Sequence, residues 1–327
     1  MTKLGIAGAV LIFAAMLVGL LHQPKPPVVV LPNPNGYDDF IQAAQAVILN
    51  ADYRSKDAAQ LRESVEKNAN ALALVRSGLT KQCRVPVVYN EAYVTNLLNE
   101  LAACKQLAFA FTAEGRLAEQ TKRTNDALRI YLDLVKFGKE CGRGGVLISK
   151  LVSLNCEALG TQELRRLSAG LSASDTQNLL EALTRIQSNE ESLESWLEPE
   201  KVWSRTAYKN WRYALARWTM RRTMRAAEQK ATDKYYLQQT ELRLLRADLA
   251  LRLYRLEKGA YPNRLEDLVP RYLDSVPIDP FSNQPLVYRP KTGSYLLYSV
   301  GPDRTDDAGV QSTSKSQGKG DLLSTAP

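Results

Sequence analysis

The chain has 327 residues, of which 45% are hydrophobic and 24% are charged, and its formal net charge is +8. This length and composition suit folded domains with buried cores and exclude a wholly disordered protein. The single histidine, His22, directly follows an apolar N-terminal run. Catalytic triads and zinc sites that need a histidine inside a folded site are therefore excluded.

The N-terminus carries a hydrophobic segment. Residues 4–21 contain no charged residue and are just long enough to span a bilayer as a helix. We interpret residues 1–23 as a retained membrane anchor, with a cleaved signal sequence as the alternative. The anchor reading predicts a single-pass protein of the bacterial inner membrane whose bulk is periplasmic, and under either reading the rest of the chain leaves the cytoplasm. The proline-rich residues 24–36 are expected to be an extended linker.

Residues 37–198 are predicted to form a helical domain, because apolar residues recur every three or four positions. Asp38 and Asp39 stand where carboxylates favour a helix start. Further helices are expected over residues 56–77, 90–111, 124–140, 146–168 and 174–197. The glycine-rich residues 138–145 lack the spacing of a phosphate-binding loop, so we interpret them as the turn of a helical hairpin.

Four cysteines lie in the helical region, and no two of them form a C-x-x-C motif. They are Cys83, Cys104, Cys141 and Cys156. In an exported protein they can form disulfides, with Cys141 and Cys156 as one candidate pair. Buried free thiols and a four-cysteine zinc site are the alternatives.

Residues 199–258 are predicted to be a long, basic helical segment. Between Pro199 and Lys230 there are nine Lys or Arg and two Glu, so most of the net charge lies here. The four tryptophans, spaced seven, eight and seven apart along one helical stripe, are Trp196, Trp203, Trp211 and Trp218. Residues 199–230 are thus a candidate contact with anionic lipid or an acidic partner, and nucleic acid is not expected. The alternative is that the tryptophans belong to the core and the arginines face solvent.

Residues 259–327 change in character and are predicted to form a small C-terminal α+β domain. Gly259 is a natural helix terminator at the end of the long helix. Two short strands are expected, over residues 286–289 and 294–300, and they are joined as a hairpin at 290–293. The residues after Val310 are expected to be a mobile tail.

The same region carries several short motifs in a fixed order. Residues 249–309 contain Leu-Tyr-Arg at a helix end, Gly-x-Tyr-Pro, Leu-x-x-Leu-Val-Pro, Tyr-Leu, Val-Pro-x-Asp-Pro, a tyrosine-containing hairpin and Tyr-Ser-x-Gly-x-Asp. This order resembles the C-terminal domain of the major pseudopilin of type II secretion, the G protein. The resemblance implies a helix packed on a small antiparallel sheet.

The resemblance also implies a metal, because that family binds calcium in its C-terminal loop. The candidate ligands here are Asp303, Asp306, Asp307 and Asp321. Carboxylate oxygens suit calcium, although the local spacing is not that of an EF-hand. A solvated acidic turn without metal is the alternative.

Two departures set the chain apart from a filament-forming pseudopilin. The family's cleavage glycine and its Phe-Thr-Leu-Ile-Glu start are absent from residues 1–21, and a long helical region separates the N-terminus from the C-terminal domain. We therefore expect a membrane-anchored structural or interaction protein of the bacterial envelope, with an envelope protein as its partner. A divergent type II secretion component is the alternative.

One enzymatic alternative exists. Ser64-Val-Glu-Lys67, Tyr208-Lys209-Asn210 and Lys291-Thr292-Gly293 follow the order of the motifs of penicillin-recognising serine hydrolases. In such enzymes a serine and a lysine one helical turn apart act as nucleophile and base without histidine. The expected helical setting and the predicted turn at 290–293 disfavour this function, and no catalytic residue is assigned.

Overall fold

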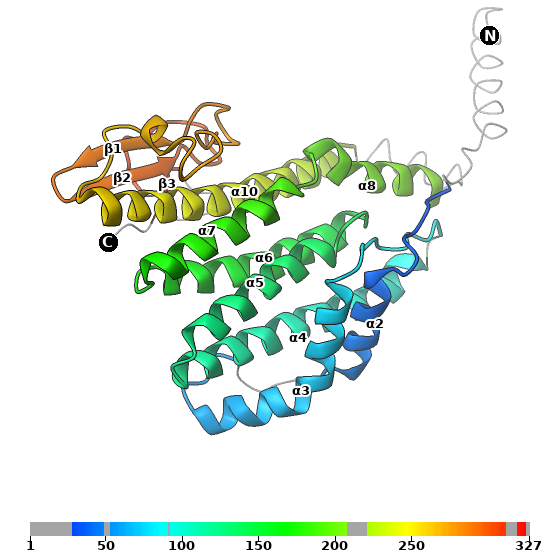
Figure 1. The fold of residues 1–327 in the computed structure, drawn as a ribbon. Coiled ribbons are helices and arrows are strands. Elements are labelled where there is room, and N and C mark those ends of the chain that lie inside the picture. Colours follow the sequence, from blue (N-terminus) through cyan, green and yellow to red (C-terminus); the bar gives the residue numbers. More distant parts are fainter. Residues whose placement is uncertain (1–27, 49–52, 91, 208–220, 312–318, 325–327) are drawn as a thin grey trace, which may run out of the picture.

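The structure, a computed structural model, describes residues 28–48, 53–90, 92–207, 221–311 and 319–324. It is mainly helical with a small antiparallel sheet near the C-terminus, as the sequence predicts (Figure 1). The helices are α2 Gly36–Ala46, α3 Ala58–Gly78, α4 Tyr93–Gln120, α5 Thr124–Glu140, α6 Leu147–Ser168, α7 Ala173–Ser188, α8 Leu193–Ala207, α10 Arg221–Lys258 and the short 3-10 helix η1 Leu265–Leu268. The strands are β1 Val287–Lys291, β2 Ser294–Ser299 and β3 Leu322–Leu323.

Side-chain caps begin two of the N-terminal helices. The Asn35 side chain accepts a hydrogen bond from the Tyr37 backbone N at 3.2 Å, so the helix begins slightly earlier than expected. Asp38 and Asp39 lie in the first turn of α2, where their charge favours the helix dipole. Asp57 caps α3 in the same way by accepting from the Ala59 backbone N at 2.8 Å.

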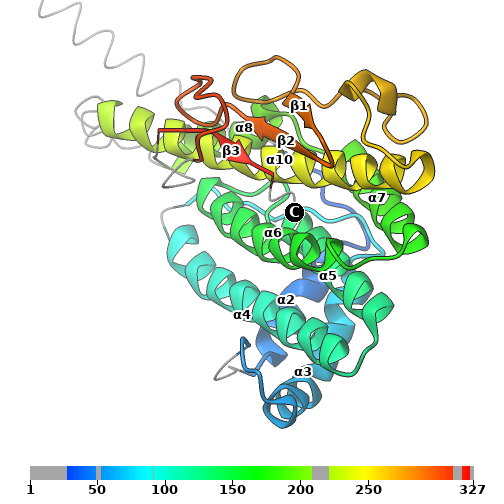
Figure 2. The ribbon, with the colours of Figure 1, turned by 90° about the vertical axis from the view of Figure 1, so that its left-hand side faces the viewer.

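The helices pack on one another largely in chain order. α2 pairs with α3, α4 packs on both, α5 packs on α4, and α6 packs on α5. Both α6 and α7 contact α10, and β2 contacts α10 as well. Figures 1 and 2 show the sheet on the side of α10 that faces away from the helical stack. The long helix α10 is therefore shared by the helical body and the C-terminal module.

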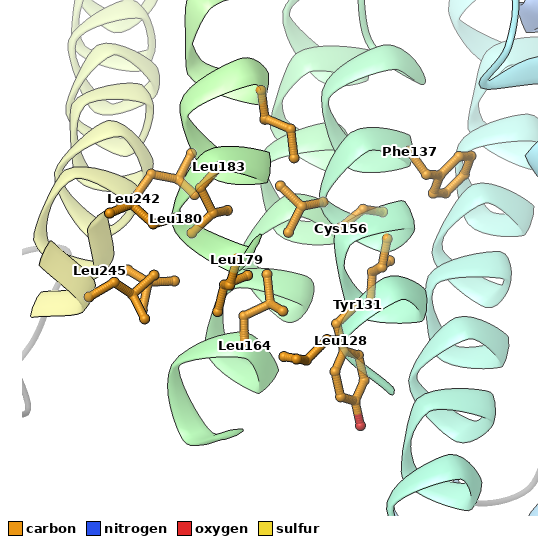
Figure 3. Close-up of a cluster of buried hydrophobic side chains, with 14 of the residues drawn as sticks. Leu128, Tyr131, Phe137, Cys156, Leu164, Leu179, Leu180, Leu183, Leu242 and Leu245 are labelled. Carbon is orange, nitrogen blue, oxygen red and sulfur yellow. The ribbon is translucent and has the colours of Figure 1, made fainter. Parts of the chain in front are cut away.

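One hydrophobic core runs through both parts, from Tyr37 in α2 to Leu322 in β3. Figure 3 shows Leu242 of α10 beside Leu180 and Leu183 of α7 within this core. These side chains come from helices that are amphipathic in sequence, and each is almost wholly buried. Burial of leucines on both sides of α10 joins the helical stack to the sheet-bearing module.

The predicted hairpin of α5 and α6 is confirmed, and two glycines allow its close packing. A Cβ atom on Gly138 would lie 2.3 Å from the Glu157 backbone N, and one on Gly160 would lie 2.9 Å from the Val135 backbone N. Gly138 belongs to α5 rather than to the turn, which begins at Cys141. Part of the predicted glycine-rich turn is thus a helix–helix contact.

The C-terminal sheet has the order β1-β2-β3 and is antiparallel throughout. The predicted β1–β2 hairpin is confirmed, with Lys291 opposite Ser294. β3 was not predicted, because residues 319–324 lie in the stretch expected to be a mobile tail. Asp321 is wholly buried and Leu322 is nearly so, which corrects that expectation for the described part of the tail.

Two predicted helix boundaries were wrong. α4 continues to Gln120 rather than ending at residue 111, and its added turns pack on α5, where the ring of Tyr131 lies against Gly115. The helix expected over 174–197 is two helices, α7 and α8. The chain breaks at Glu190 and Glu191, whose carboxylates turn toward Lys139 and Lys150 respectively.

The predicted membrane localisation needs correction. Among residues 28–48, 53–90, 92–207, 221–311 and 319–324, no helix is both long enough and apolar enough to cross a bilayer. This finding contradicts the expected single-pass inner-membrane localisation. The anchor predicted within residues 1–23 lies outside the described residues.

Candidate functional site

A groove of about 1430 Å³ opens at one end of the helical stack. Its walls are the extended residues 28–32, the connection between α3 and α4, the C-terminal ends of α5 and α7, and α8. The connection contains residues 82–89, which form neither helix nor strand, and it is tied to the α5–α6 turn by the Val85 backbone N, which donates to the Arg143 carbonyl at 2.9 Å.

Charged side chains of both signs line this groove. The basic ones are Lys81, Arg84, Lys136, Lys139, Arg143 and Arg185, and the acidic ones are Glu140, Glu190, Glu191 and Glu198. Some of them pair with each other: Arg143 forms two hydrogen bonds of 2.7 Å with the Glu140 carboxylate. Arg84 and Glu198 form no ion pair among the described residues. The groove therefore presents fixed ion pairs together with charges that are available to a ligand.

A buried ion pair lies beneath the groove. The Lys150 side chain is 1% exposed and pairs with Glu191, and its ammonium group lies 5.9 Å from the centre of the Trp196 ring. Burial lowers the pKa of Lys150, while the Glu191 carboxylate opposes that shift. Burial has the opposite effect on the neighbouring carboxyl of Glu190, whose pKa it raises. A buried charge is tolerated only with a partner, so this pair fixes the α7–α8 break against α6.

Apolar side chains border the same groove. Val28 is 94% exposed and Val30 is 81% exposed, and both line the groove. Ile186 and Val202 contribute apolar surface from α7 and α8. The groove thus combines exposed apolar side chains with charges that form no ion pair among the described residues.

The groove has little that could perform covalent chemistry. Burial raises the pKa of the Cys83 thiol to about 12, so this thiol stays protonated and unreactive at neutral pH. The single histidine of the chain, His22, lies outside the described residues.

The four aspartates of the predicted calcium site lie in the β2–β3 connection, but they hold the loop by different contacts. Asp303 accepts from the Gly320 backbone N at 3.1 Å. Asp306 accepts from the Tyr298 hydroxyl at 2.7 Å, which lowers the pKa of Asp306. Asp321 accepts from the backbone N atoms of Asp307 and Gly309, at 3.3 and 2.7 Å.

Within the part of the chain that the structure describes, no three of these or other His, Cys, Asp or Glu side chains gather as metal ligands. Two features still suit a cation. The Oδ2 atom of Asp307 is buried and makes no hydrogen bond with a described residue, and burial raises the pKa of the adjacent Asp321. A nearby cation would give the Asp307 Oδ2 atom a partner. It would also favour the ionised form of the Asp321 carboxyl.

Sequence reasoning missed two aspartates that hold the C-terminal module together. Asp279 is 1% exposed and accepts from the Ser299 hydroxyl at 2.8 Å and from the backbone N atoms of Val300 and Phe281, both at 3.0 Å. Asp248 of α10 accepts from the Tyr295 hydroxyl at 2.9 Å. The signal for Asp279 was its place in the Val-Pro-x-Asp-Pro motif.

The groove was also missed, although Lys150 gave a signal. Lys150 lies within the largely apolar residues Val146 to Val152. A lysine in such a run is expected to be buried, and a buried charge needs an oppositely charged partner. Its partner Glu191 is 41 residues away in the chain, so the sequence alone does not identify it.

The hydrolase motifs do not come together in the described structure. Lys67 pairs with Glu63 at 2.6 Å on the exposed face of α3. Lys291 ends β1, and Figures 1 and 2 place α3 and the β1–β2 hairpin at opposite ends of the molecule. Tyr208-Lys209-Asn210 lies outside the described residues.

The described tryptophans belong to the core. Trp196 and Trp203 are 4% and 5% exposed, and the Trp203 ring N–H donates to the Val88 carbonyl at 3.0 Å. Trp211 and Trp218 lie outside the described residues. On α10, Arg222, Arg225 and Lys230 are exposed, and a lipid or acidic contact through 199–230 stays a prediction.

All four cysteines are buried free thiols in the structure. Cys104, Cys141 and Cys156 meet where α4, α5 and α6 pack together. Hydrogen bonding with Cys104 and with Cys156, together with burial, raises the pKa of Cys141 well above its usual range. Cys83 lies apart, at the groove, and so the cysteines do not form a four-thiol zinc site.

Comparison with known proteins adds no relative. No protein-family model, no curated protein and no solved structure matches this chain. The resemblance to the major pseudopilin therefore stays a prediction from the sequence.

Proposed function

We propose that this chain is a non-enzymatic interaction protein whose helical body binds a partner protein in the groove between α5, α7 and α8. The observation that carries the proposal is the lining of that groove, where Arg84 and Glu198, which form no ion pair with any described residue, lie among ion pairs and exposed valines. Interfaces between proteins combine apolar surface with polar groups in this way. The buried Lys150–Glu191 pair supports the proposal, because it holds the groove wall in one conformation.

We propose further that the C-terminal module is pseudopilin-G-like and binds calcium through its β2–β3 connection. Support comes from the packing of α10 on an antiparallel sheet and from the buried, unpartnered Oδ2 atom of Asp307. Asp303, Asp307 and Asp321 would hold the ion, which would supply positive charge to the loop and no catalytic step. A divergent type II secretion component is a second candidate, favoured by the ordered motifs of residues 249–309.

Charge reversal at the groove tests the proposed binding. The tagged full chain is purified from its own cells as wild type, as the double variant Arg84→Glu with Arg185→Glu, and as the control Arg62→Glu on the exposed surface of α3. We expect a protein that is retained by wild type and by the control and is lost from the groove variant. The same retained proteins in all three samples would contradict the proposal.

A further inference from the structure

A second cavity lies across the α3–α4 connection from the groove. It has a volume of about 500 Å³ and is lined by the N-terminal parts of α2 and α4 and by the connection itself. Arg84, Val87 and Tyr89 line the groove, whereas Val85 and its neighbours Pro86 and Val88 line this cavity. The α3–α4 connection therefore separates the groove from this cavity. The cavity volume is that of a pocket for a small organic group.

The charged side chains that line this cavity are both acidic. They are Asp38, in the first turn of α2, and Glu100 of α4. Among the described residues, neither carboxylate forms an ion pair with a lysine or arginine. Glu100 accepts a hydrogen bond from the Tyr37 hydroxyl at 3.3 Å. Two unpaired carboxylates at one cavity favour a cationic ligand and repel an anionic one.

The cavity also contains a buried polar group without a partner. Tyr93 is 8% exposed, and its buried hydroxyl oxygen makes no hydrogen bond within the described structure. Burial, and after it the charge of Glu100, raise the pKa of Tyr93. A buried hydroxyl without a partner is costly, and an N–H donor in the cavity would satisfy it.

Aromatic rings complete the lining. Tyr37 is 1% exposed and Tyr93 packs against Trp203, with ring centres 6.5 Å apart, so both tyrosine rings are held in place. Leu97 and Ile41 provide apolar surface for an alkyl chain. The lining thus matches an alkyl chain that ends in a cation.

We propose that this cavity binds an alkylammonium or alkylguanidinium group. Glu100 and Asp38 balance its charge, the Tyr93 hydroxyl accepts one of its N–H groups, and the apolar side chains contact its carbon chain. The cation can come from a free amine or guanidine, or from a lysine or arginine side chain of a polypeptide. This binding does not depend on the partner proposed for the groove.

Calorimetric titration of the full chain tests the proposal. The probes are n-butylammonium, n-butylguanidinium, the uncharged analogue 1-butanol, and the capped peptides acetyl-Gly-Lys-Gly-amide and acetyl-Gly-Arg-Gly-amide. We expect saturable binding of at least one cation and none of 1-butanol. Tighter binding of a peptide than of the free cations would assign the site to a side chain, and the reverse would assign it to a small molecule.

Three variants identify the site. Glu100→Gln keeps an acceptor for Tyr37 but removes the charge, and should weaken binding about tenfold. Tyr93→Phe keeps the ring, and should weaken binding several-fold. Glu66→Gln, on the exposed surface of α3, is the matched control and should leave affinity unchanged.

If Glu100→Gln does not fold, as judged by circular dichroism, Asp38→Asn takes its place, because Asp38 is exposed. The proposal is overturned if no cation binds, if 1-butanol binds as well as the cations, or if the charge-removing variant binds like Glu66→Gln. Each of these results would leave the groove proposal unaffected.

Discussion

At the scale of single residues, several buried carboxylates connect segments that are distant in the sequence. Asp279 and Asp248 fix the sheet and its loops, and Glu157 lies between α5, α6 and α10. Their partners come from distant parts of the chain. The sequence shows which residue types are present, but it does not show that these carboxylates are buried.

Replacement of Asp279 by alanine should destabilise the C-terminal module. The change would leave two buried backbone N–H groups and the Ser299 hydroxyl without their acceptor, at a cost of about 3 kcal/mol in the free energy of unfolding. Denaturant unfolding followed by circular dichroism measures this. Asp274→Ala is the control, because the Asp274 side chain is 81% exposed and should change stability little. Equal effects of the two substitutions would contradict the assigned role of Asp279.

Glu157 should make stability depend on pH. Burial raises the pKa of Glu157 from its ordinary value of 4.5 to about 7, against the opposing effects of Lys139 and Gln238. The folded protein then holds this proton more tightly than the unfolded chain, so its stabilising contribution is present below pH 4.5 and is lost as the pH rises through 7. The difference in unfolding free energy between wild type and Glu157→Gln should change by about 3 kcal/mol across this window. A difference that is constant with pH would show that Glu157 does not titrate in this way.

At the scale of elements, local patterns in the sequence predicted most helices well. The period of apolar residues identified α5 exactly over residues 124–140 and α6 to within one residue. The errors have long-range causes. The break between α7 and α8 depends on Lys139 and Lys150, and β3 forms because Tyr298 and Ser299 of β2 pair with it. None of these partners is near in the sequence.

The α5–α6 contact should not tolerate a methyl group at Gly138. A Cβ atom there would meet the backbone of Glu157, so Gly138→Ala should lower the unfolding free energy by about 2 kcal/mol or more. Gly170→Ala is the matched control, because the nearest atom to its Cβ would lie 3.9 Å away. Thermal unfolding of both variants checks this. A midpoint for Gly138→Ala equal to that of the control would mean that the helices are less tightly packed.

The β2–β3 connection should become more stable with calcium. A ligand that binds the folded state raises the thermal midpoint, and we expect a rise of a few degrees with calcium relative to chelator. Asp303→Ala should abolish the rise, and Asp274→Ala should keep it. Comparison within each variant removes the stability lost with the Asp303 contacts to Thr305 and Gly320. Equal midpoints with calcium and chelator would contradict the proposed metal site.

At the scale of the whole molecule, α10 joins two parts that the sequence presents as different in character. The helical body packs on one side of it and the sheet on the other, within one hydrophobic core. The sequence predicted both parts. It did not predict the groove or the acidic cavity, because the groove combines residues from five segments of the chain and the cavity combines residues from three. Only the packed helices bring Arg84, Arg185 and Glu198 to one surface.

The most direct test of the account is photo-crosslinking in living cells. A photoreactive amino acid replaces Val87 or Arg185 in the groove, or Arg62 on the remote surface of α3, in the full chain. If the groove binds a partner protein, both groove positions should give the same discrete crosslinked product, and position 62 should not. If the groove positions give no discrete product, or the same product as position 62, the groove is not the binding surface.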